Sequence, residues 1–81
     1  MNVTIRFYSI SKDLAGASEM SLIVKPNALL ADALELLYTE KPSLVPIRSS
    51  VLYAVGLQYA TMDTRLAEGN TISLIPPVQG G

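Results

Sequence analysis

Cysteine, histidine and tryptophan are absent from this chain of 81 residues, and charged residues make up only 16% of it. Without cysteine the chain has no disulfide, no thiolate nucleophile and no zinc-binding thiolate, and without histidine it lacks the commonest metal ligand and neutral-pH base. Six basic and seven acidic side chains give a formal net charge of −1, whereas a nucleic-acid-binding surface needs clustered Lys and Arg. These absences disfavour a self-contained enzyme and a nucleic-acid-binding protein, and we expect no metal or cofactor site on the chain.

Hydrophobic residues, in contrast, make up 49% of the chain. A chain of this length forms one small domain. The apolar residues can all belong to a Leu- and Ala-rich core, or some of them can lie exposed where a partner binds. The longest apolar-rich stretch, residues 28–38, contains Asp32 and Glu35 and is far shorter than the roughly 20 residues of a membrane span. The N-terminus shows no signal-peptide pattern, so we expect a cytoplasmic protein without a membrane partner.

The first half of the chain predicts a hairpin followed by a helix. Polar and apolar residues alternate over residues 3–8 and 20–24, which indicates two antiparallel strands, with residues 11–18 as a connecting loop. Apolar side chains then recur at helical spacing, which predicts one helix from residue 29 or 30 to residue 38, with Leu30, Ala33, Leu34 and Leu37 on its buried face.

The second half predicts three further strands, over residues 51–55, 59–62 and 71–75. Gly56-Leu57 has the composition of a two-residue type II′ turn between the first two of them. In the last strand, Ile72 and Leu74 point to one face and Ser73 and Ile75 to the other. The element order is therefore ββαβββ. The fold class that it predicts is α+β, with one main helix packed on one face of a mixed sheet.

The most informative segment follows the last strand. We divide the chain into a domain of residues 1–75 and an extended tail, which consists of Pro76, Pro77, Val78, Gln79, Gly80 and Gly81. Two prolines hold the backbone extended, and two glycines without side chains can pass through a narrow channel. The carboxylate of Gly81 would then be the most accessible carboxyl group of the molecule.

The order of elements and the Gly80-Gly81 ending resemble the ubiquitin-like β-grasp sulfur carriers. With its Pro76-Pro77-Val78 segment, the Lys12–Gly16 loop and the Leu66–Asn70 turn, the chain looks most like the small subunits of molybdopterin synthase, over its whole length. Three residues depart from the family pattern. Gly56 stands where the family usually has Asn, Leu29 stands where a Thr cap is common, and Ile75 stands where Phe is frequent. These departures concern turn geometry, helix capping and interface packing, and leave the chemistry of the tail unchanged.

The resemblance implies a mechanism in which this chain carries sulfur and its partners perform the catalysis. An ATP-dependent activating (adenylyltransferase) enzyme, using ATP and Mg, would adenylate the Gly81 carboxylate. A sulfur donor protein would then convert it to a thiocarboxylate. The tail would enter the active site of the large synthase subunit, where the sulfur builds the dithiolene of molybdopterin. The family also implies a complex with two copies of each subunit.

Some alternatives stay open from the sequence. We expect Ile75 and Val78, at the base of the tail, to contact the partner, although Ile75 could equally complete the core. A related carrier for thiamine, cysteine or tRNA thiolation has the same fold, but the thiamine carriers are usually shorter and lack the proline pair. A ubiquitin-like protein modifier would share the activation step, although the tail of ubiquitin itself is Arg-rich and this tail is uncharged.

Overall fold

The computed structural model describes residues 1–76 of the chain. The elements are β1 (Asn2–Phe7), α1 (Ile10–Ala15), β2 (Glu19–Ile23), α2 (Leu30–Glu40), the 3-10 helix η1 (Pro42–Ser50), β3 (Leu52–Val55), β4 (Gln58–Tyr59) and β5 (Thr71–Ile75). The strands form one sheet in the order β2-β1-β5-β3-β4. The central pair, β1 and β5, is parallel and the other pairs are antiparallel. The predicted mixed sheet with one main helix is confirmed.

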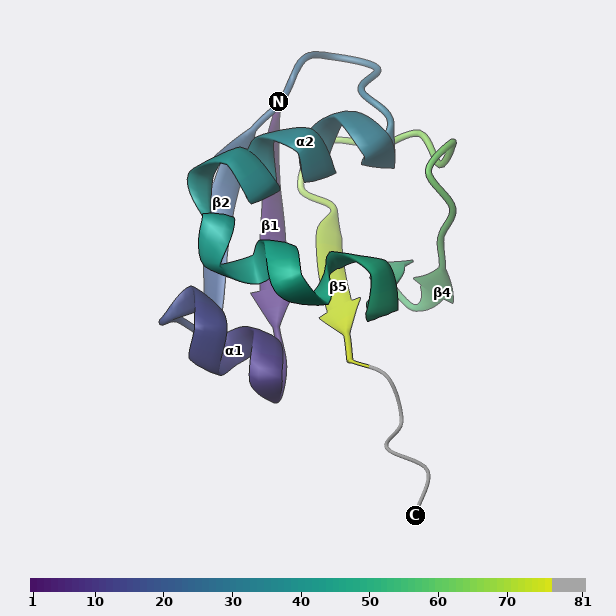
Figure 1. The fold of residues 1–81 in the computed structure, drawn as a ribbon. Helices are drawn as coiled ribbons and strands as arrows, with labels where there is room; N and C mark the ends of the chain where they lie inside the picture. The colour runs from purple at the N-terminus through teal and green to yellow at the C-terminus, as the bar shows by residue number, and fades with distance from the viewer. Residues whose placement is uncertain (77–81) are drawn as a thin grey trace.

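The core lies between the sheet and the helices α2 and η1, which Figure 1 shows on the same side of the sheet. The face of α2 predicted from the spacing is buried, and it packs with alternate residues of the strands (Leu30, Ala33, Leu34 and Leu37 with Val3, Ile5, Phe7, Ile72 and Leu74). We call this side of the sheet its inner face and the opposite side its outer face. Among residues 1–76, no helix is long and apolar enough to cross a membrane.

The main helix begins and ends close to its predicted bounds. It starts at Leu30, where the Asp32 carboxylate accepts a hydrogen bond of 2.9 Å from the backbone N–H of Leu29. Asp32 therefore caps the first turn from inside the helix. The helix continues two residues past the predicted end to Glu40, just before Pro42 prevents continuation.

The loop predicted over residues 11–18 is wrong, because helix α1 occupies most of it. Ser11 is fully buried, and its hydroxyl donates to the carbonyl of Tyr8 at 2.7 Å and accepts from the N–H of Tyr8 at 2.9 Å. Gly16 ends the helix in the left-handed conformation, with φ of 73°. A buried serine and a half-exposed Ile10 invert the usual apolar pattern of a helix. The hydrophobic pattern of the sequence therefore did not predict α1.

The strand predicted over residues 59–62 is also misplaced. Gly56, with φ of 62°, and Leu57 form the predicted two-residue turn, which sets Val55 opposite Gln58 and starts β4 at Gln58. The strand ends at Tyr59 because a turn closes soon afterwards. The N–H of Thr64 donates to the Thr61 carbonyl at 3.0 Å, and the Thr64 hydroxyl accepts from the N–H of Thr61 at 3.1 Å. The local hydrogen bonds of this turn replace ladder pairing.

Candidate functional site

The central strand of the sheet leads directly into the predicted tail. β5 lies between β1 and β3, and its last residue, Ile75, is followed by Pro76, where the described part of the chain ends. The remaining tail residues lie outside the described residues, so the threading and thiocarboxylate roles predicted for them stay predictions (Pro77, Val78, Gln79, Gly80 and Gly81). Figure 1 shows that β5 exits the sheet at the end opposite the N-terminus of β1.

Ile75 lies on the outer face of the sheet, away from α2. It pairs with Leu52 of β3, whereas Leu74 pairs with Tyr53 on the inner face. Because side chains alternate along a strand, the burial of Ile72 and Leu74 in the core turns Ile75 outward, and it is only partly buried. The structure therefore places Ile75 outside the core, at the surface position that a partner contact requires.

Apolar side chains gather around Ile75 on this outer face. The set, which we call the tail-base patch, consists of Tyr8, Leu52, Leu57, Tyr59 and Ile75. Leu57 at the tip of the β3–β4 turn is fully exposed, and Tyr59 and Leu52 are 74% and 56% exposed. The patch borders an open depression of about 420 Å³, which is also lined by the small residues Ala54 and Ser73 and by Pro76. An exposed apolar surface with a hollow is typical of a protein-binding site.

A charged pair borders the patch on the side of β1. The Arg6 guanidinium lies 3.6 Å from the Glu19 carboxylate, and both side chains are half exposed. Interactions with the Tyr8 hydroxyl group, followed by the charge of Glu19, raise the pKa of Arg6. Polar groups around an apolar centre match the usual anatomy of a protein interface. In the part of the chain that the structure describes, no group of three or more acidic side chains comes close enough to hold a metal ion.

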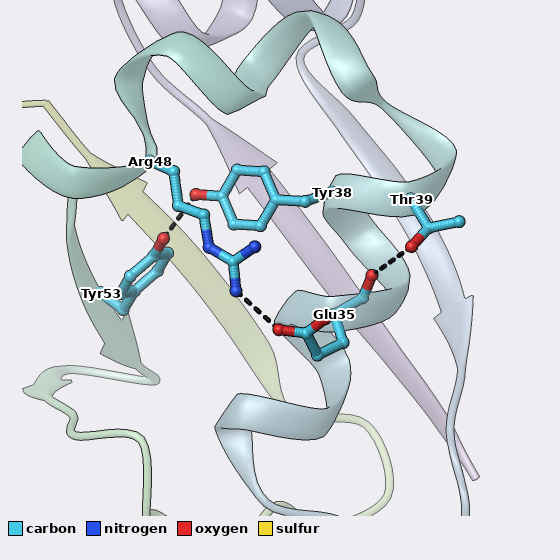
Figure 2. A network of polar contacts seen from close by, with 5 residues as sticks. All are labelled: Glu35, Tyr38, Thr39, Arg48 and Tyr53. Carbon is cyan, nitrogen blue, oxygen red and sulfur yellow. Dashed lines mark hydrogen bonds and ion pairs between the residues drawn. The ribbon is translucent and has the colours of Figure 1, made fainter.

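A second polar cluster lies on the inner side and has a structural role (Figure 2). The buried hydroxyls of Tyr38 in α2 and Tyr53 in β3 are hydrogen-bonded to each other. The guanidinium of Arg48 lies 4.6 Å from the centroid of the Tyr38 ring and donates to Glu35 at 2.7 Å. Burial is the main cause that raises the pKa of both tyrosines. The cluster therefore ties α2 and η1 to β3, the strand that carries part of the tail-base patch.

Sequence reasoning identified Ile75 but missed most of the tail-base patch. The signal was present in strand β3, whose sequence Leu-Tyr-Ala-Val is apolar at every position. An antiparallel strand with one face in water alternates between apolar and polar residues. In β3, Tyr53 and Val55 face the core side and Leu52 and Ala54 the outer side, so apolar side chains stand on both faces. Leu57 was assigned only to a turn, and full exposure of a leucine there has no structural purpose.

Comparisons with known proteins agree with this architecture. The chain is 34% identical to the molybdopterin synthase sulfur carrier subunit of Aedes aegypti, and the match covers all of this chain and 90% of that protein. SAMP1 from Haloferax volcanii superposes with a TM-score of 0.90 over the whole of both chains at 22% identity, which confirms the ubiquitin-like β-grasp fold.

A second similar structure is a protein–protein complex of subunits 1 and 2 of the molybdopterin-converting factor from Helicobacter pylori. The matching chain of that complex is 27% identical, with a TM-score of 0.72 and full coverage of both chains. The model of the ThiS family matches residues 5–81, which run from the second half of β1 through β5 and the predicted tail. The chain therefore belongs to the ThiS family.

Proposed function

We propose that this chain is the sulfur carrier subunit of a molybdopterin synthase. The observation that carries the proposal is its likeness, over the whole chain, to curated subunits of that name. The geometry supports it, because the central strand of a rigid sheet leads into the Pro-Pro-Val-Gln-Gly-Gly segment beside an exposed apolar patch. The chain would position a reactive group and leave the catalysis to its partners.

The proposed chemistry takes place at the carboxylate of Gly81. A carboxylate oxygen attacks the α-phosphorus of ATP, so that an acyl-adenylate forms and pyrophosphate leaves. A sulfur donor protein then supplies a persulfide, whose outer sulfur attacks the acyl carbon and displaces AMP; a second thiol of the partners cleaves the resulting S–S bond by forming a disulfide with the donor, and a thiocarboxylate remains. In the synthase, this sulfur passes to the pterin precursor and the carboxylate returns. With no Cys in the chain, the thiolates of these steps come from the partners, and we assign the general acids and bases to the partners as well.

The reach of the tail determines where the partners must bind. Six residues beyond Ile75 span at most about 20 Å when fully extended. An active site that receives Gly81 must therefore lie within about 20 Å of Ile75, so the surface around that active site has to contact the tail-base patch. We propose that the large subunit of the synthase covers this patch, with Leu57 and Tyr59 as its most exposed anchors.

Mass spectrometry of the intact protein, isolated from its own cells, tests the proposal. We expect a fraction of the chain to carry the mass difference between oxygen and sulfur, located at Gly81 by fragmentation. A Gly81 deletion should abolish this species and molybdopterin synthesis together, while the folded domain keeps its thermal stability. If Gly81 carries nothing but the free carboxylate in cells that make molybdopterin, the proposal is contradicted. Gly81 joined to lysines of other proteins would also contradict it, because that is the product of a protein modifier.

A further inference from the structure

The edge of the sheet farthest from β4 is open. β2 is the outermost strand, and within residues 1–76 it pairs only with β1. The ladder between them extends past the strand at both ends. Phe7 donates to the Ser18 carbonyl, and Val24 and Met1 exchange N–H···O bonds. Hydrogen-bonded pairs alternate along an antiparallel ladder. The even-numbered residues 18–24 therefore bond to β1. The N–H and C=O groups of Glu19, Ser21 and Ile23 and the N–H of Lys25 point away from the sheet, whereas the Lys25 carbonyl accepts from the N–H of Ala28 at 3.1 Å.

Over residues 20–24, this edge carries none of the features that normally prevent pairing with another chain; the charged residues Glu19 and Lys25 stand at its ends, and Pro26 follows. Residues 19–25 contain no proline, and the register with β1 is continuous without a bulge. No charged side chain points inward, because the inner-face positions are Met20, Leu22 and Val24. Ile23, on the outer face, is 77% exposed. An unprotected strand of this kind is a template for a further strand. The opposite edge, β4, has only two residues.

The sequence of β2 is complementary to itself. Suppose that a second copy pairs antiparallel with the first about a two-fold axis at Leu22. The residue numbers of any two residues that lie opposite each other then add up to 44. Glu19 then lies opposite Lys25 of the second copy, and Ser21 lies opposite Ile23 of the second copy. Apart from the Lys25 carbonyl, these positions have backbone groups that point outward, so this register forms up to about six new hydrogen bonds. We propose that two copies of this chain associate through β2 and join their sheets into one.

Charge selects this register over its neighbours. An axis at Ser21 would place Glu19 opposite Ile23 and leave Lys25 without a counter-ion. An axis at Ile23 would place Lys25 opposite Ser21. Only the axis at Leu22 brings opposite charges together, at both ends of the paired segment. Glu19 has capacity for this contact because its side chain is 54% exposed and its distance to Arg6 is 3.6 Å, which is longer than a charge-assisted hydrogen bond.

Apolar contacts on the inner face support the same pairing. In this register, partly buried Met20 faces Val24 of the second copy, and the two Leu22 side chains are neighbours. Leu22 and Val24 are already buried in their own core, so the newly covered apolar surface at these positions comes mainly from Met20. Next to this edge, an open cavity of about 450 Å³ is lined by Val24, Ala28 and Leu36, among others, and Leu36 is 42% exposed. The pairing leaves β5, β3 and β4 free, so each copy keeps its tail-base patch available. The inference does not depend on the proposed function.

Sedimentation velocity over protein concentrations from about 10 µM to about 1 mM tests the association, since interfaces of this small size are weak. We expect a reversible dimer. Lys25→Glu should raise its dissociation constant about tenfold, because each pair of opposite charges becomes a pair of like charges. The double variant Glu19→Lys/Lys25→Glu should restore most of the affinity. Arg65→Glu is the matched control: it changes the net charge equally, at an exposed site in the connection between β4 and β5, and should leave the dimer unchanged.

Disulfide crosslinking tests the register itself, and the absence of cysteine from the chain removes any background. Opposite hydrogen-bonded residues have Cα atoms about 5.5 Å apart, within the range of a disulfide. A mixture of Ser21→Cys and Ile23→Cys proteins, oxidised with glutathione disulfide, should therefore form mainly the mixed dimer. Each variant alone should crosslink poorly, because its cysteines lie roughly 8 Å or more apart. A monomer at every concentration, a dimer insensitive to Lys25→Glu, or equal crosslinking in all mixtures would overturn the inference.

Discussion

Leu57 offers the sharpest test of the tail-base patch, because the folded domain makes no use of its side chain. It occupies the tip of the β3–β4 turn with its side chain fully exposed. Leu57→Ser should therefore leave the free energy of unfolding within about 0.5 kcal/mol of the parent. If the large subunit buries this side chain completely, the substitution removes about 1.5–3 kcal/mol of apolar burial. That loss corresponds to an affinity about 10- to 150-fold weaker.

Isothermal titration of each variant with the large subunit measures this loss, and urea unfolding checks that the fold is intact. Ile23→Ser is the matched control, since Ile23 is 77% exposed on the same outer face but at the far edge of the sheet. We expect it to bind the large subunit with unchanged affinity, at concentrations where the carrier is monomeric. If Leu57→Ser also binds within twofold of the parent, the patch does not contact the large subunit and the reasoning is refuted.

Two further predictions concern the buried tyrosine pair. Tyr53→Phe leaves the Tyr38 hydroxyl buried without the partner it has in the structure, and should lower the free energy of unfolding in urea by about 1–3 kcal/mol. Tyr59→Phe, at an exposed tyrosine, is the control. If both substitutions lower the free energy of unfolding equally, the hydrogen bond between Tyr38 and Tyr53 does not stabilise the fold. Because burial raises the pKa of Tyr53 and Tyr38 above the normal tyrosine value, the folded state retains protons that the unfolded state loses. Stability should therefore fall as the pH rises above about 10. Tyr53→Phe should make this fall in stability shallower. If urea titrations at pH 9 and 11 show the same loss of stability for the parent and the variant, the fall is not due to the buried tyrosine pair.

Periodicity in the sequence was sufficient for the parts of the fold in which one face is buried. β1, β2, β5 and α2 each have an apolar side toward the core, so alternation and helical spacing located them. α1 was not predicted because its buried residue Ser11 is a polar one, held by hydrogen bonds to the backbone of Tyr8. A hydrophobic pattern cannot indicate burial of this kind. The Tyr38–Tyr53 contact was not predicted either, since it joins residues 15 positions apart whose meeting depends on how α2 packs on the sheet.

The site was predicted more unevenly than the fold. The Gly80-Gly81 ending and Ile75 stood out because their composition differs from that of an ordinary strand and loop. The rest of the tail-base patch is assembled by sheet order, which brings β1 beside β5 and β5 beside β3. Nothing in the local sequence around Tyr8 indicates that Leu57 lies across the same depression. A surface built from three distant segments becomes visible only once the strand order is known.

The central place of β5 has a consequence for how a partner could recognise the state of this protein. Within the sheet, the β1–β2 hairpin and the β3–β4 hairpin are joined only through β5, so the strand that leads into the tail is also the one that holds the two halves together. If β5 detaches, Tyr8 separates from Leu52 and Leu57, and the tail-base patch no longer exists. An enzyme that binds the patch before acting on the tail would therefore act on folded chains and ignore unfolded ones, although the tail sequence is the same in both.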